Sequence, residues 1–196
     1  MKNNLTELVF ILDRSGSMHG LEADTIGGFN SMIDEQKKLE GEVLVSTVLF
    51  SNDSVTVHDR VSIDQIRPMT EDDYRVGGCT ALLDAVGGMI EHIETIHRYI
   101  RPSDVPEKTM FVITTDGLEN ASRKYTGRQV RKMIEKKKED GWEFIFLASN
   151  IDAAETAEEM GIGAANSAQF DATPAGSRKM YAEACAAVSR CRTRKN

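Results

Sequence analysis

The chain has 196 residues, of which 40% are hydrophobic and 28% are charged, and its formal net charge at pH 7 is −7. This length and composition are typical of a globular protein with one core, and the negative charge disfavours non-specific binding to nucleic acid or to an anionic membrane. No stretch approaches the roughly 20 apolar residues that a membrane-spanning helix needs.

The chain contains three cysteines, Cys79, Cys185 and Cys191. They are odd in number and lack the spacing of a zinc site, which is typical of proteins from a reducing compartment. The apolar run near the N-terminus is shorter than the apolar segment of a signal peptide. We therefore expect a cytoplasmic protein in which Cys79 is a small buried thiol, while Cys185 and Cys191 could form a fortuitous pair.

Strand-like and helix-like patterns alternate along the chain. The expected strands share continuous or alternating apolar residues and cover residues 8–12, 42–50, 55–61, 109–115, 142–148 and 168–170. The expected helices carry apolar residues at helical spacing and cover residues 21–39, 82–100 and 128–140, and two more start near Asp152 and at Pro174. The third strand is more polar than the others and follows a turn, so we expect it to pair as a hairpin at a sheet edge.

Strands separated by helices of this length imply an α/β fold of the doubly wound, Rossmann-like type. We expect a mostly parallel central sheet with one antiparallel edge strand and helices on both faces. Residues 1–196 are expected to form a single domain, with its core at about residues 5–190. Residues 191–196 are a basic tail, interpreted as a frayed helix end that complements the helix dipole.

Five oxygen-bearing side chains stand at the ends of expected strands or helices. Asp13, Ser15 and Ser17 follow the first strand, Thr80 precedes the second long helix, and Asp116 follows the fourth strand. Ligands of doubly wound folds bind at the carboxyl ends of the strands, where these residues would meet. Two carboxylates and three hydroxyls suit a small, hard cation, so we expect Mg²⁺ or Mn²⁺ in preference to Ca²⁺.

Each segment also has an ordinary structural explanation. Asp13, Ser15, Ser17 and Thr80 could cap the helices that follow them, and Asp116 precedes a glycine in what could be a simple turn. We favour a shared metal site because all three segments fall where one site requires them.

The motif Asp13-x-Ser15-x-Ser17, the downstream Thr80 and the Thr-Asp116-Gly segment resemble a von Willebrand factor type A (vWA) domain with an intact metal-ion-dependent adhesion site (MIDAS). The resemblance covers almost the whole chain. It implies that Ser15 and Ser17 bind the metal directly, that Asp13 and Asp116 act largely through water, and that Thr80 does either. It also implies that a partner protein supplies a further oxygen from an Asp or Glu side chain.

The resemblance favours a binding module over an enzyme. The first alternative is a Mg²⁺-dependent phosphotransferase or phosphatase of the haloacid-dehalogenase type, which expects a second Asp as general acid where this chain has Ser15. The second is a purely structural scaffold stabilised by the metal. For the binding module we expect a protein partner, no nucleic acid and no membrane; a monomer is compatible with the sequence.

Residues near the motif have simpler expected roles. His19 is interpreted as an exposed loop histidine, although it could tune the rim of the site. Glu119 and Asn120 could add an oxygen, but loop solvation is the favoured interpretation. Residues 63–76 are a candidate rim loop near Thr80.

Overall fold

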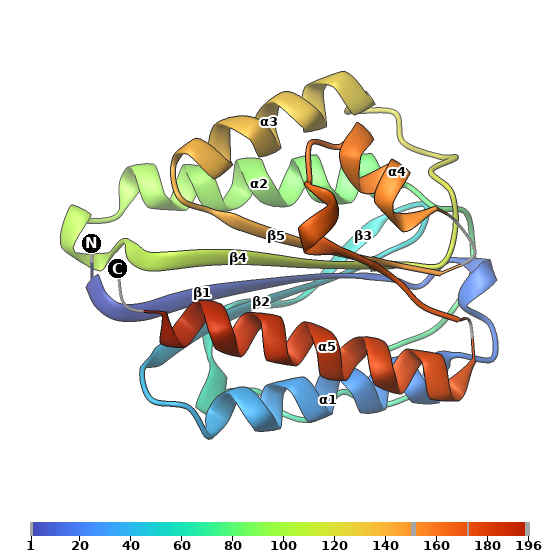
Figure 1. Ribbon diagram of the computed structural model, residues 1–196, viewed down its shortest axis with the longest axis horizontal. Helices are drawn as coiled ribbons and strands as arrows, with labels where there is room; N and C mark the ends of the chain where they lie inside the picture. Colours follow the sequence, from blue (N-terminus) through green and yellow to red (C-terminus); the bar gives the residue numbers. More distant parts are fainter. Residues whose placement is uncertain (1, 150–151, 172, 195–196) are drawn as a thin grey trace.

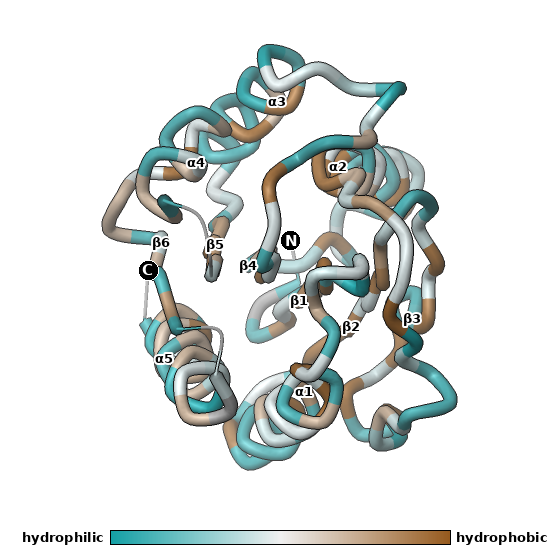
Figure 2. The backbone as a smooth tube through the Cα atoms, turned by 90° about the vertical axis from the view of Figure 1, so that its right-hand side faces the viewer, coloured by the Kyte–Doolittle hydropathy of each residue, from teal (hydrophilic) through white to brown (hydrophobic). Residues whose placement is uncertain are grey.

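The computed structural model describes residues 2–149, 152–171 and 173–194. These residues form a six-stranded sheet in the order β3-β2-β1-β4-β5-β6 (Figures 1 and 2), in which β3 is antiparallel to β2 and the other neighbouring pairs are parallel. The strands are β1 (Lys2–Asp13), β2 (Glu42–Phe50), β3 (Ser54–Ser62), β4 (Pro106–Thr115), β5 (Glu143–Ala148) and β6 (Ser167–Gln169). The α-helices are α1 (Glu22–Lys37), α2 (Leu82–Tyr99), α3 (Gly127–Glu139), α4 (Ala153–Glu159) and α5 (Pro174–Thr193).

Helices cover both faces of the sheet (Figure 2). Apolar residues of α2, α3 and α4 pack on one face with Val9 and Phe111, whereas α1 and α5 pack on the other face with Leu8 and Phe10. Successive residues of β1 therefore point to opposite sides, and both sides are buried. The predicted fold class, a mostly parallel doubly wound sheet with one antiparallel edge strand, is confirmed.

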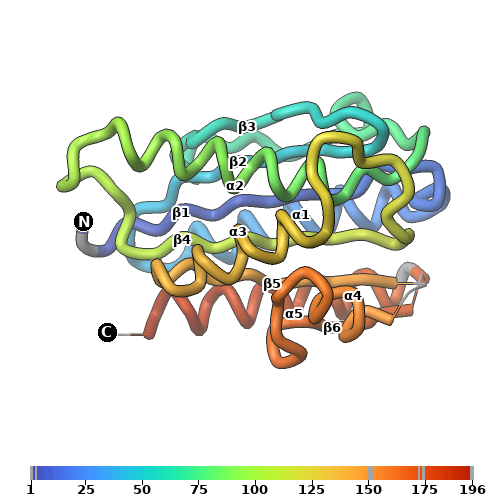
Figure 3. Tube along the Cα trace, turned by 90° about the horizontal axis from the view of Figure 1, so that it is seen from above, coloured from blue at the N-terminus to red at the C-terminus, as the bar shows by residue number. Residues whose placement is uncertain are grey.

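The two ends of the sheet differ in what they carry. The start of β1 and the end of α5 lie at one end of the molecule (Figures 1 and 3), where Lys108 of β4 donates hydrogen bonds from Nζ to the carbonyls of Cys191 and Arg192 at 2.8 and 2.9 Å. The loops that follow β1 and β4 lie at the opposite end. The candidate residues of these loops therefore gather where the carboxyl ends of the parallel strands meet.

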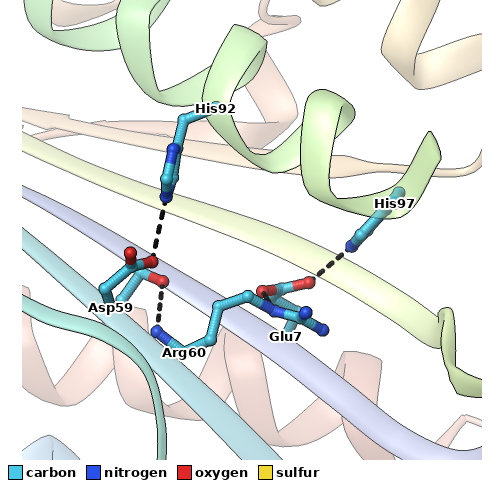
Figure 4. Close-up of polar contacts among 6 residues, drawn as sticks. Glu7, Asp59, Arg60, His92 and His97 are labelled. Carbon is cyan, nitrogen blue, oxygen red and sulfur yellow. Dashed lines mark hydrogen bonds and ion pairs between the residues drawn. The ribbon is translucent and has the colours of Figure 1, made fainter. Parts of the chain in front are cut away.

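The strand β1 is longer than the predicted residues 8–12 because backbone pairing extends it through polar positions. Its residue Glu7 is fully buried, and its carboxylate accepts hydrogen bonds from Arg60 Nε at 2.6 Å and His97 Nε2 at 2.5 Å (Figure 4). Arg60 has a φ of +51° at an irregularity in the β2–β3 pairing. This buried carboxylate joins β3 and the C-terminal part of α2 to the centre of the sheet.

The described part of the expected basic tail, residues 191–194, does not behave as a frayed end. Helix α5 continues to Thr193, so residues 191–193 of the expected tail belong to it. The guanidinium of Arg192 donates to the carbonyl and side-chain oxygens of Gln36 at 2.7 and 2.9 Å, which ties this helix end to α1. Residues 195–196 lie outside the described residues. Cys185 and Cys191 are free thiols and form no pair.

None of the helices within the described ranges is both long enough and apolar enough to cross a membrane.

Candidate metal centre

Asp13 ends β1 and is buried, and its two carboxylate oxygens have different partners. Oδ1 accepts a hydrogen bond from the backbone N–H of Ser15 at 2.7 Å, and Oδ2 accepts one from Thr115 Oγ1 at 2.6 Å. Thr115 is the last residue of β4, so this bond joins the ends of two neighbouring strands. Thr115 was not predicted to have a role, although its place directly before Asp116, at the end of a buried strand, is a signal visible in the sequence.

The hydroxyls of Ser15 and Ser17 lie 3.1 Å apart, and Ser17 Oγ donates to Asp116 Oδ1 at 2.6 Å. The other oxygen of this carboxylate, Oδ2, is buried and has no hydrogen-bond partner among the described residues. A buried carboxylate oxygen without a donor is unfavourable. It is the kind of group that a cation or a bound water satisfies.

Thr80 approaches the same point from the loop before α2. A Cβ atom built on Gly117 would lie 3.1 Å from Ser17 Oγ and 3.4 Å from Thr80 Oγ1, so both hydroxyls face this glycine. Hydrogen bonds between Thr80 and Asn120 run in both directions, with the Thr80 N–H donating to Asn120 Oδ1 at 2.9 Å and the Asn120 N–H donating to the Thr80 carbonyl at 3.0 Å. The structure therefore brings together all five residues singled out in the sequence.

Backbone contacts hold the first two loops against each other. The Gly16 N–H donates to the Gly78 carbonyl and the Gly77 N–H donates to the Arg14 carbonyl, both at 2.9 Å. Gly78 has a φ of +85°, and a Cβ atom there would lie 2.1 Å from the side-chain oxygen of Asn52. Both the positive φ and this close approach favour glycine at this position.

Glu119 is partly exposed and has a structural role in the loop after β4. Its carboxylate accepts hydrogen bonds from the backbone N–H groups of Ala121, Ser122 and Leu83, at 2.9, 2.7 and 2.8 Å. Because Leu83 lies in the first turn of α2, Glu119 ties the loop after β4 to this helix. Both Glu119 and Asn120 therefore brace the segment that carries Thr80, a role that was not predicted, although Asn120 is exposed as a loop-solvating residue would be.

The environment of the two carboxyl groups favours a positive partner. Burial raises the pKa of Asp13, although hydrogen bonds from Thr115 and Ser15 oppose this shift. Burial also raises the pKa of Asp116, and the nearby carboxylate of Asp13 adds to the shift. A bound cation would favour the charged form of both buried carboxyl groups and would offset the effect of Asp13 on Asp116.

The remaining expectations near the site have mixed outcomes. Cys79 is exposed, not buried, and its N–H donates to Asn52 Oδ1 at 2.9 Å. His19 is exposed, as expected, with Nδ1 3.2 Å from a carboxylate oxygen of Glu22. In the segment 63–76, the buried Tyr74 donates its hydroxyl hydrogen bond to the Asp13 carbonyl, so this segment supports Asp13 from inside.

The described residues contain no group of three or more His, Cys, Asp or Glu side chains placed to hold a metal. The candidate centre is of another kind, since it combines two carboxylates with hydroxyl oxygens. Such a donor set fits a hard cation that retains some of its water.

No protein-family model matches this sequence, and no curated protein matches it. Among solved structures, the vWF domain of the type V pili tip protein Mfa5 from Porphyromonas gingivalis is similar, with a TM-score of 0.67 and 9% identity over 97% of both chains. The pilus adhesin SpaC from Lactobacillus rhamnosus GG also has a TM-score of 0.67, with 12% identity over 97% of this chain. Proximal thread matrix protein 1 from the mussel byssus, in a structure with a zinc-occupied MIDAS motif, has a TM-score of 0.57 and 13% identity over 92% of this chain.

The chain spans 31% of the SpaC chain and 46% of the mussel protein, and so corresponds to one part of each. At these identities the similarity defines the fold, which is that of a vWA domain. Several of these neighbours are adhesion or matrix proteins by name.

Proposed function

We propose that this chain is a divalent-metal-dependent protein-binding module that captures an acidic side chain of a partner protein. The observation that carries the proposal is the convergence of Ser17 Oγ and the Asp116 carboxylate, whose Oδ2 has no other partner within the described residues. The donor set and this unpaired oxygen both fit a hard cation. We propose Mg²⁺ or Mn²⁺, with Asp13, Ser15, Ser17, Thr80 and Asp116 as the residues that hold it.

The hydroxyls and the carboxylates would have different roles. The hydroxyls of Ser15, Ser17 and Thr80 are neutral metal ligands, so they would leave most of the positive charge on a bound ion. The two Asp carboxylates already accept hydrogen bonds, Asp13 from Thr115 and Asp116 from Ser17. Such bonds orient a carboxylate that acts on a metal directly or through water. When bound, the ion supplies a positive site that attracts a carboxylate oxygen from outside.

The same residues argue against phosphoryl transfer. A haloacid-dehalogenase-type enzyme needs a carboxylic acid two positions after its first Asp to protonate the leaving group. Here the side chain is that of Ser15, which is buried and lies beside Ser17. We therefore propose a site that holds its partner without transforming it. From its free thiols we also propose that the protein is cytoplasmic.

Titration with Mn²⁺, followed by calorimetry or electron paramagnetic resonance, tests the proposal. Wild type should show one saturable site, and Ser17→Ala and Asp116→Asn should weaken it at least tenfold. The matched control is Asp64→Asn, which removes the same charge from an exposed residue. Asp64 follows the end of β3, where Ser62 pairs with Leu44 near the start of β2, so it lies away from the carboxyl ends of the parallel strands. Equal affinity in wild type and Asp116→Asn would overturn the assignment of the site.

The partner's chemistry is tested with N-acetyl-aspartate methylamide as the probe. In Mg²⁺, this compound should shift the backbone amide resonances of Ser17, Thr80 and Gly117, and EDTA should abolish the shifts. Shifts that are the same with and without Mg²⁺ would show that carboxylate binding does not need the metal.

A further inference from the structure

A cavity of about 330 Å³ lies between helix α2 and the β2–β3 hairpin. Ala81, the residue after Thr80, forms part of its wall, so the cavity begins one residue along the chain from the candidate metal centre. The N–H of Ala81 also donates to the carbonyl of Ser51 in the hairpin turn at 2.9 Å. A partner that binds at Thr80 and reaches past Ala81 would therefore meet this cavity.

The floor of the cavity is apolar and one wall is aromatic. Val48 and Met89 are buried and line the floor, and Tyr125 forms part of the wall. The ring of Tyr125 packs against Gly87, where a Cβ atom would come within 2.6 Å of it. The next residue, Gly88, also lines the cavity, and a Cβ atom there would meet nothing within 4 Å. Two adjacent glycines thus admit the ring and leave room beside it.

Acidic side chains outnumber basic side chains around this floor. Asp53 and Asp84 line the cavity, against one basic residue, Lys124. Burial works against ionisation of Asp84, but three backbone N–H groups donated by residues 123–125 lower the pKa of its carboxyl, so it is charged at neutral pH. Lys124 is exposed and has a long flexible side chain, whereas Asp84 is held by the loop.

We propose that this cavity is a subsite for a basic side chain, and specifically for an arginine that the partner carries close to its metal-bound acidic residue. The aliphatic part of an arginine fits the apolar floor, its planar guanidinium can stack on Tyr125, and its charge complements Asp53 and Asp84. The subsite rests on the proposed function, because the partner's carboxylate at the metal places the arginine here. The partner would thus present an acidic and a basic side chain in one short segment.

The first test omits the metal, so that it does not depend on the metal centre. N-acetyl-arginine methylamide is titrated into the protein in EDTA and followed by backbone amide shifts at residues 53, 88 and 124. N-acetyl-norleucine methylamide, which has an apolar linear side chain, is the comparison. We expect the arginine compound to shift these amides with at least threefold higher affinity than the norleucine compound.

Two variants locate the binding. Asp53→Asn should lower the affinity for the arginine compound about threefold and leave the norleucine compound unaffected, whereas Asp64→Asn, an equal charge change outside the cavity, should alter neither. Gly88→Leu should fill the cavity and abolish the shifts, with its melting temperature measured to show that it folds. Equal binding of both compounds, or arginine binding unchanged by Asp53→Asn and Gly88→Leu, would overturn the proposal.

A linked probe separates the subsite from the metal centre. The peptides Ac-Asp-Gly-Gly-Arg-NH₂ and Ac-Asp-Gly-Gly-norleucine-NH₂ are compared in Mg²⁺, where the arginine peptide should bind at least tenfold more tightly because both ends are held. If the peptide shows no Mg²⁺ dependence while the arginine compound still binds in EDTA, the metal-dependent function is wrong and the subsite is supported. If Mg²⁺ dependence persists without any preference for arginine, the subsite is wrong.

Discussion

Ser17 Oγ and Asp116 Oδ1 are joined by a hydrogen bond of 2.6 Å, although the two residues are 99 positions apart in the chain. The bond connects the loop after β1 to the loop after β4, the two central strands of the sheet. It leaves Asp116 Oδ2 without a partner within the described part of the chain, which is the main reason to expect a cation there.

Metal binding should stabilise the folded protein, because the proposed site exists only when the three loops are brought together. At a free Mg²⁺ concentration about 100 times the dissociation constant, the free energy of unfolding should rise by about 2.7 kcal/mol. Thermal unfolding in EDTA and in Mg²⁺ measures this, and Ser17→Ala should show a smaller increase. The metal would instead be purely structural if EDTA unfolded the protein and carboxylate binding was lost only together with the folded structure.

Asp116→Asn should stabilise the metal-free protein at pH 7 by about 1 kcal/mol, because it removes a buried negative charge next to Asp13. The sign follows from the raised pKa of the Asp116 carboxyl in the folded state. Its favourable contribution is present below the unfolded value near 3.8 and is lost as the pH rises through the folded value. The variant should therefore differ most from wild type at pH 7 and least near pH 3.

Urea unfolding in EDTA at several pH values measures this difference. Adding Mg²⁺ should reverse the order, since wild type gains a ligand and the variant does not. A variant that is less stable than wild type in EDTA at pH 7 would contradict the electrostatic account.

Glu7→Gln should lower the free energy of unfolding by about 3 kcal/mol, since it leaves the side chains of Arg60 and His97 without their buried anion. Glu42→Gln is the matched control. It breaks the exposed pair with Lys2 and should change stability by less than about 1 kcal/mol. Chemical denaturation of both variants provides the comparison, and equal effects would show that burial of Glu7 adds nothing.

Gly78→Ala should destabilise the protein by about 1–3 kcal/mol, because alanine is strained at a φ of +85° and its methyl group would meet Asn52. It should also weaken metal binding, since the same loop carries Thr80. Gly163→Ala is the control, because a Cβ atom at that position meets nothing within 4 Å. Thermal unfolding and Mn²⁺ titration of the two variants measure both effects; a normal metal affinity in Gly78→Ala would show that the loop tolerates the change.

Much of the fold could be predicted from apolar periodicity. The strand at residues 42–50 was predicted with the bounds that the structure has, because it is apolar and a turn follows it directly. The start of β1 could not be predicted, since its polar residues pair through the backbone and a buried glutamate is recognisable only once Arg60 and His97 are near it.

The five candidate residues could be located because strand ends and helix starts are local signals. What supports them could not be foreseen, since it depends on contacts between distant segments. Glu119 follows Asp116 by three positions, yet its role depends on Leu83, and an isolated sequence motif does not reveal such a partner. The exposure of Cys79 depends in the same way on how its loop packs against Asn52.

The reciprocal bonds between α2 and the loop after β4 have a consequence for protein engineering. Glu119 of the loop accepts the N–H of Leu83 in the helix, while Asp84 of the helix accepts the N–H groups of residues 123–125 in the loop. The two segments are therefore one mechanical unit and should shift together. Grafting either one alone onto a related scaffold would leave carboxylates without donors, so a transplanted binding surface would have to include both.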